Sequence, residues 1–76
     1  MYILNPLLAV ELKKKMHINQ ILTITKLSEI TGINRNTLSK VLSGKKEPTV
    51  DNMDRLIKAL NIPLSEAGEV FYKKVI

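Results

Sequence analysis

Hydrophobic residues recur along this 76-residue chain at spacings of three and four positions, the period of an α-helix, rather than in the alternation typical of a strand. Residues that break helices, such as Gly32, Gly44 and Pro48, fall between these runs. The pattern predicts five helices joined by short turns. We therefore expect an all-α fold in which residues 1–76 form a single domain.

The first two expected helices lie on either side of residues 17–22, a segment to which the pattern assigns no clear conformation. The first begins near Pro6, because proline is tolerated in a first helical turn. The second runs from about Ile24 to Thr31, with Thr23 as its N-cap and Gly32 as a left-handed residue at its end. The inward residues are Leu8, Leu12 and Met16 in the first helix and Leu27 and Ile30 in the second.

A third helix is expected directly after the turn formed by residues 32–34. Asn34 is a suitable N-cap, because its side-chain oxygen can accept from the backbone amide of Asn36 or Thr37. Gly44 closes this helix. Its buried side is formed by Leu38, Val41 and Leu42.

The last two expected helices follow a loop at residues 45–48. The fourth, from about Val50 to Leu60, has the clearest amphipathic pattern, and the fifth starts at Pro63. The inward residues are Met53, Leu56, Ile57 and Leu60 in the fourth helix and Leu64, Ala67, Phe71 and Val75 in the fifth. With Tyr72 and Ile76 added, the C-terminal part has more apolar surface than one small core needs, so we expect a dimer contact there.

The segment of residues 24–43 has the features of a helix-turn-helix. Two short helices joined by a three-residue turn cross at a steep angle, so the second can enter a groove while the first braces it. Ser28 is small where the helices approach, and Ile33 can fill their junction. The outward positions of the second helix are Arg35, Asn36, Ser39, Lys40 and Ser43, with Thr37 at the side. Arg and Asn side chains suit bidentate contacts to guanine and adenine edges.

Charge is distributed unevenly along the chain, which has a net charge of +5. Residues 1–46 hold eight Lys and Arg against two acidic residues, whereas residues 47–76 hold four against five. A basic half that contains the motif is expected of a protein that binds a polyanion. A solvated surface would explain the charge alone equally well, so the position of the basic residues must decide between this interpretation and polyanion binding. Lys45 and Lys46 follow the outward-facing helix, where a duplex backbone would pass, whereas the run from Lys13 to Lys15 fits a solvated helix face.

The stretch from Thr23 to Pro48 resembles the phage-repressor family, the lambda-repressor-like and Cro-like helix-turn-helix domains. The resemblance rests on the spacing of Gly32, Leu38-Ser39, Gly44-Lys45 and Pro48, and it covers roughly residues 8–70. It implies a five-helix, sequence-specific DNA-binding domain that commonly binds a two-fold operator as a homodimer.

The resemblance also implies roles for individual residues. Arg35, Asn36 and Lys40 stand in base-reading positions, whereas Thr37, Ser43 and the following loop would hold phosphates. Ile24 stands where many members carry a glutamine that bridges the DNA backbone and the recognition helix, and Leu42 replaces a residue that is often polar. The full expected set is Arg35, Asn36, Ser39 and Lys40 for bases, and Thr23, Thr25, Thr37, Ser43, Lys45 and Lys46 for phosphates.

Other classes of function find little support in the sequence. The chain has no cysteine and a single histidine, His17, so we assign no metal site and no cofactor. The acidic residues are scattered over helix surfaces and no glycine-rich phosphate loop is present, so we assign no catalytic residues and expect no enzyme. No apolar run reaches the roughly 18 residues that cross a membrane, and Met1 to Leu4 is too short for a signal-peptide core. We therefore expect a cytoplasmic protein without membrane contact.

The function most consistent with these features is that of a double-stranded DNA-binding transcriptional regulator, a repressor of a prophage, plasmid or bacterial operon. It would act as a homodimer that occludes DNA. Two alternatives stay open. One is an antitoxin that represses its own operon and neutralises a partner protein. The other is a helical protein-interaction module that uses its basic face to hold an acidic protein and does not bind DNA.

Overall fold

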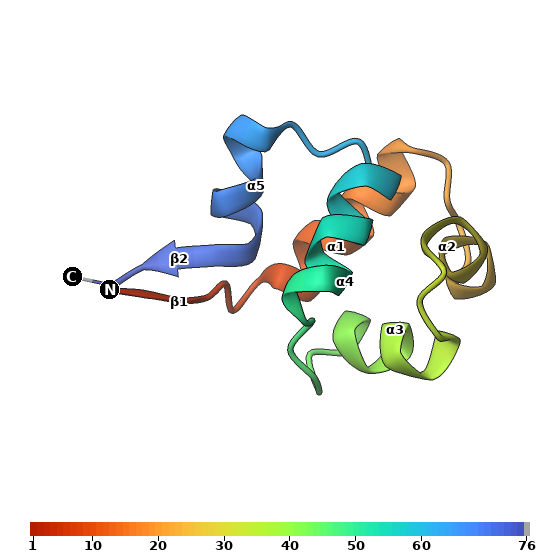
Figure 1. The fold of residues 1–76 in the computed structure, drawn as a ribbon, viewed down its shortest axis with the longest axis horizontal. Coiled ribbons are helices and arrows are strands. Elements are labelled where there is room, and N and C mark those ends of the chain that lie inside the picture. Colours follow the sequence, from red (N-terminus) through yellow and green to blue (C-terminus); the bar gives the residue numbers. More distant parts are fainter. Residues whose placement is uncertain (76) are drawn as a thin grey trace.

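The computed structural model describes residues 1–75 as five helices and a two-stranded antiparallel ribbon (Figure 1). The helices are α1 (Leu8–Ile18), α2 (Ile24–Thr31), α3 (Arg35–Leu42), α4 (Val50–Ala59) and α5 (Leu64–Phe71), and the strands are β1 (Tyr2–Leu4) and β2 (Tyr72–Lys74). The helix-turn-helix pair α2 and α3 lies at one end of the molecule, and the ribbon lies at the other (Figure 1).

Helix α1 begins at Leu8, two residues after the Pro6 that was expected in its first turn. Local sequence signals place the starts of α2 and α4 where the pattern predicts them. The hydroxyl oxygen of Thr23 accepts from the backbone N–H of Lys26 at 3.1 Å and starts α2. In the same way Thr49 accepts from the N–H of Asn52 at 3.1 Å and starts α4. Each bond satisfies one of the amide groups that a helix N-terminus leaves without an intrahelical partner.

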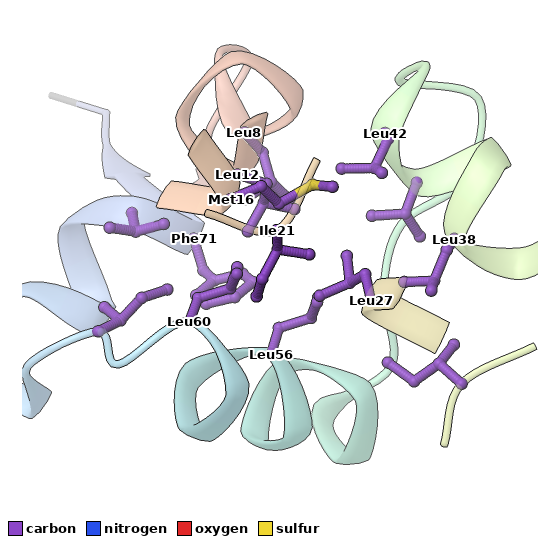
Figure 2. Packing of buried hydrophobic residues seen from close by; sticks show 14 residues of the cluster. Leu8, Leu12, Met16, Ile21, Leu27, Leu38, Leu42, Leu56, Leu60 and Phe71 are labelled. Atoms are coloured by element: carbon purple, nitrogen blue, oxygen red, sulfur yellow. The ribbon is translucent and has the colours of Figure 1, made fainter. Parts of the chain in front are cut away.

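All five helices contribute to one hydrophobic core, which lies between α1, α4 and the helix-turn-helix (Figure 2). The largest fully buried side chains are Leu12 of α1, Leu27 of α2, Leu38 of α3, Leu56 and Leu60 at α4, and Phe71 of α5. A core this small depends on each large side chain, because truncating a buried leucine to alanine costs about 2–5 kcal/mol. The orientation of α3 is therefore coupled to the stability of the whole core.

The fifth helix is shorter than predicted, and its expected continuation is a strand. Tyr72 and Val75 do not extend the apolar stripe of α5, because the chain becomes extended at Tyr72 and pairs with β1 in the register Tyr2↔Lys74, Ile3↔Lys73 and Leu4↔Tyr72. Val75 is exposed. The remaining residue of the predicted C-terminal stripe, Ile76, lies outside the described residues.

Asn5 provides the physical reason for this ending. Its backbone N–H donates to the carbonyl oxygen of Phe71 at 2.8 Å, and its side-chain amide donates to the carbonyl oxygen of Val70 at 2.9 Å. These carbonyl groups belong to the last turn of α5, where the helix itself supplies no donor. A residue far away in sequence therefore ends the helix and begins the ribbon.

Besides Val75, two inward assignments are wrong. Ile30 is 47% exposed, and Leu64 is 83% exposed. In α2 the inward position near the C-terminus is occupied by Thr31, one residue further along and about 100° around the helix. Leu64 is the first residue of α5, directly after Pro63, whereas the buried residues of this helix are Val70 and Phe71 at its other end.

Residues 17–22 combine the end of α1 with a tight turn. Gln20 has a left-handed backbone with φ of 59°, and the N–H of Ile21 donates to the carbonyl oxygen of Met16 at 2.8 Å. The side-chain amide of Asn19 donates to the carbonyl oxygens of Lys15 and Leu60, at 2.7 and 2.8 Å, and so joins the ends of α1 and α4. This turn buries Ile21 and directs the chain into α2.

Among residues 1–75, no helix has the length and hydrophobicity needed to span a bilayer.

Candidate nucleic-acid interface

The turn between α2 and α3 is held by hydrogen bonds from both helices and from α4. Gly32 takes the left-handed conformation, with φ of 75°, which only glycine adopts without steric cost. The Ser28 hydroxyl donates to the carbonyl oxygen of Ile33 at 2.6 Å, and Nη1 of Arg55 donates to the carbonyl oxygen of Thr31 at 3.0 Å. The small size of Ser28 allows this close approach, as expected from the sequence.

Thr31 gives the turn a second internal support. Its hydroxyl donates to the carbonyl oxygen of Leu27 at 2.8 Å and accepts from the backbone N–H of Ile33 at 3.1 Å. Thr31 is only 6% exposed, so both bonds are shielded from water. A buried polar residue with all its groups paired fixes one geometry, because any other geometry would leave a donor or acceptor unsatisfied.

The start of α3 confirms the predicted cap. The side-chain oxygen of Asn34 accepts from the backbone N–H of Asn36 at 2.7 Å. Below the helix, the buried side chains of Ile33, Leu38, Val41 and Leu42 pack into the core, as predicted for each of them. Figure 2 shows Leu38 and Leu42 pointing from this helix toward the other buried side chains.

The opposite face of α3 is open to solvent. The residues predicted to contact bases, Arg35, Asn36, Ser39 and Lys40, are all exposed, and Thr37 is half-buried at the side. Among residues 1–75, neither Arg35 nor Lys40 takes part in a salt bridge. The structure therefore brings four hydrogen-bonding side chains together on one face of a short helix whose other face is fixed in the core. Such an arrangement can offer donors to a groove without prior rearrangement of the helix.

The residues predicted to contact phosphates lie around this face, and they differ in whether their hydroxyl groups already form hydrogen bonds within the chain. Thr23, Thr25, Ser43, Lys45 and Lys46 are exposed. The hydroxyl of Thr23 caps α2, and that of Ser43 donates to the carbonyl oxygen of Lys40 at 3.1 Å. The backbone N–H groups of Lys45 and Lys46 donate to the same carbonyl oxygen at 2.8 and 3.3 Å, so the loop folds back on the end of α3.

The lysine run of α1 has partners within the chain. Lys15 Nζ lies 3.3 Å from a carboxylate oxygen of Glu66, and Lys14 Nζ lies 3.8 Å from one of Glu11. These pairs offset part of the positive charge on α1, consistent with a solvated face rather than a nucleic-acid contact.

Within residues 1–75, no group of three or more His, Cys, Asp or Glu side chains is placed to hold a metal ion.

Sequence reasoning missed Thr31 and Arg55 as residues that position the interface. Arg55 also pairs with Asp51 four residues earlier, Nε to Oδ2 at 2.9 Å, and in the sequence this spacing indicates only a surface ion pair. Thr31 carried a usable signal, because it is a polar residue at an inward position directly before a helix-ending glycine. Ile24, at the position where the resemblance implies a glutamine, is half-buried and packs against the core.

A comparison with protein families agrees with this geometry. The sequence model of the HTH_3 helix-turn-helix family, of the Cro/C1 type, matches residues 11–66, which include α2, the turn, α3 and α4. No curated protein and no solved structure matches the chain. The match covers most of the chain and extends to both sides of the motif. The chain therefore belongs to the Cro/C1-type helix-turn-helix family, an all-α family of DNA-binding transcriptional regulators.

Proposed function

We propose that this protein is a sequence-specific repressor that binds operator DNA as a homodimer, with α3 in the major groove. The observation that carries the proposal is the exposed face of α3, where Arg35, Asn36, Ser39 and Lys40 are grouped on a helix anchored by a fully buried Leu38. Their hydrogen-bonding groups match those of base edges in the major groove. By occupying an operator of a prophage, plasmid or bacterial operon in the cytoplasm, the dimer would exclude the transcription machinery.

The roles of the side chains follow from their positions. Arg35 and Asn36 lie in the first turn of α3, and the N-terminal residues of a recognition helix are those that reach base edges. Ser39 and Lys40 lie one turn further along the same face. Thr23, Thr25, Thr37, Ser43, Lys45 and Lys46 surround this face and would contact phosphates, which fix the register of the helix on the duplex.

The two types of contact have different consequences for binding. Base contacts distinguish operator from random DNA, whereas each phosphate contact releases counterions and makes binding depend on salt. In a homodimer, two copies of α3 would enter successive major grooves about 34 Å apart, so the operator is expected to have two-fold symmetry.

Fluorescence anisotropy of a labelled random duplex, measured over a series of salt concentrations, tests this function. The combined variant Arg35→Ala, Asn36→Ala, Lys40→Ala is compared with the wild type. The matched control is Lys14→Ala, Lys58→Ala, which removes the same number of positive charges from exposed ion pairs on α1 and α4. Circular dichroism verifies that every variant is folded.

The proposal predicts wild-type binding that weakens steeply with salt, a large loss of affinity in the α3 variant and a smaller loss in the control. If the wild type does not bind duplex DNA even at low salt, DNA binding is excluded as the function. The basic face would then have to serve a protein partner instead. If the control loses as much affinity as the α3 variant, binding of the duplex does not depend on this face.

A further inference from the structure

The ribbon at the end opposite the helix-turn-helix has an outer edge on β1. The N–H of Asn5 donates to the carbonyl oxygen of Phe71 at 2.8 Å, and the N–H of Val75 donates to that of Met1 at 2.9 Å. Both bonds share the register that places Ile3 opposite Lys73. Because hydrogen-bonded residues alternate along an antiparallel pair, the backbone groups of Ile3 face β2, whereas those of Tyr2 and Leu4 face away from it.

The two outer edges of the ribbon differ in charge. If two copies paired β2 to β2 around a two-fold axis at its centre, Lys73 would lie opposite Lys73, and like charges in that position repel. Lysines on an edge strand are a common device against such pairing. The same symmetric pairing of β1 would place Ile3 opposite Ile3, a favourable apolar pair, and no charged residue is present in β1.

The β1 edge also adjoins apolar surface that the fold leaves uncovered. Tyr2 is 68% exposed and Ile3 is 42% exposed. Tyr2 borders an open groove of about 730 Å³ between the ribbon and α5, and the largely exposed Leu64 and the partly exposed Tyr72 also line it. A two-stranded ribbon is marginally stable by itself in water, whereas three or more strands with an apolar face are stable.

We propose that two copies of this chain associate through their β1 strands, antiparallel and around a two-fold axis at Ile3, into a continuous sheet in the order β2, β1, β1, β2. Tyr2 and Leu4 exchange both backbone hydrogen bonds with Leu4 and Tyr2 of the second copy. The partner at this edge is a second copy of the chain, because the register pairs the outward N–H and C=O groups of Tyr2 and Leu4 symmetrically. It also places no two like charges opposite each other. The inference deepens the homodimer of the proposed function, on which it rests, and assigns its interface.

Sedimentation equilibrium over micromolar to millimolar protein concentrations tests the interface. Ile3→Glu places two acidic groups opposite each other in the dimer, while the new carboxylate lies next to Lys73 within its own ribbon, so the fold is retained. Tyr2→Pro removes an outward N–H that β1 does not use for pairing with β2. Ile3→Val is the matched control, because it keeps a neutral β-branched side chain at the same position.

The proposal predicts that wild type and Ile3→Val dimerise, whereas Ile3→Glu and Tyr2→Pro raise the dimer dissociation constant by roughly tenfold or more. Hydrogen exchange gives a second readout with an internal control. The amide protons of Tyr2 and Leu4 become protected as concentration rises, whereas that of Ile3 is protected in monomer and dimer alike. A wild type that stays monomeric at millimolar concentration, or a dimer that persists unchanged in both variants, would overturn the interface.

These outcomes are separable from failure of DNA binding. A monomeric Ile3→Glu variant retains the α3 face and is expected to bind random duplex at low salt. If wild type and Ile3→Val dimerise and Ile3→Glu and Tyr2→Pro do not, but none of the four proteins binds DNA, the β1 interface stands and the proposed function fails. If Ile3→Glu dimerises as tightly as the wild type and binds DNA equally well, the function stands and the interface fails.

Discussion

The guanidinium of Arg55 donates a hydrogen bond to the carbonyl oxygen of Thr31 at 3.0 Å, which ties α4 to the last residue of α2. A helix C-terminus leaves carbonyl groups without an internal donor, and a cation there also interacts favourably with the helix dipole. The Nε–H of the same guanidinium donates to Oδ2 of Asp51 at 2.9 Å. The turn that orients α3 is therefore supported by a helix outside the motif.

Arg55→Ala is expected to lower the free energy of unfolding by about 1–2 kcal/mol, because the Thr31 carbonyl loses a partly buried, charge-assisted hydrogen bond. Lys58→Ala on the same helix is the matched control, since it removes only an exposed pair with Asp54. The control should cost no more than about 0.5 kcal/mol. Urea denaturation measures both. Equal losses would show that the Thr31 contact contributes nothing beyond a surface ion pair.

Gly32→Ala is expected to be more destabilising than Gly44→Ala. Both glycines have positive φ, 75° and 77°, so both substitutions incur a backbone cost of about 1–2 kcal/mol. An added Cβ at Gly32 would also lie 3.0 Å from Nη1 of Arg55, whereas nothing lies within 4 Å of one at Gly44. The difference in unfolding free energy between the two variants isolates this contact. If Gly44→Ala is the more harmful, the close packing of Arg55 against the turn is not significant.

Thr31→Val keeps the shape of the buried side chain and removes its hydroxyl. The backbone N–H of Ile33 then has no acceptor in a buried position, and we expect a loss of about 1–3 kcal/mol. Chemical denaturation gives the magnitude. Ser43→Ala, which removes an exposed hydroxyl bond at the end of α3, serves as the control and should have a smaller effect. A Thr31→Val variant as stable as the wild type would refute this support of the turn.

Arg35→Ala and Lys45→Ala should differ in how they affect DNA binding. Loss of a base-reading Arg35 is expected to reduce the discrimination between operator and random duplex by about 1–3 kcal/mol. Loss of a phosphate-contacting Lys45 should weaken binding to both duplexes alike and reduce the salt dependence by about one ion. Anisotropy titrations with an operator obtained by selection and with a scrambled duplex measure both quantities. If the ratio of operator affinity to scrambled-duplex affinity is the same in the two variants, these roles are contradicted.

The positions of α2, α3 and α4 could be predicted because their signals are local. Thr23, Asn34 and Gly32 each act within a few residues of their own position, and the apolar spacing identifies the buried side of each helix. The face that carries Arg35 and Lys40 follows directly, because it is the side opposite the buried residues. Local patterns were therefore sufficient for the outline of the candidate interface.

The ribbon and the support of the turn depend on contacts distant in sequence. Phe71 and Val75 have helical spacing, and only pairing with the N-terminal segment and the amides of Asn5 turn this region into a strand. The partner of Arg55 at Thr31 lies 24 residues away. A periodicity argument contains no information about such pairs, so it extended α5 too far and gave Arg55 no role.

The central claim is that duplex DNA contacts the exposed face of α3, and NMR chemical-shift mapping tests it most directly. A ¹⁵N-labelled wild-type protein is titrated with a short duplex at low salt. The account predicts that the largest shifts occur at the backbone amides of Arg35, Asn36, Ser39 and Lys40 and in the loop of residues 43–46. Shifts concentrated instead on α5 and the ribbon, with α3 unchanged, would contradict it.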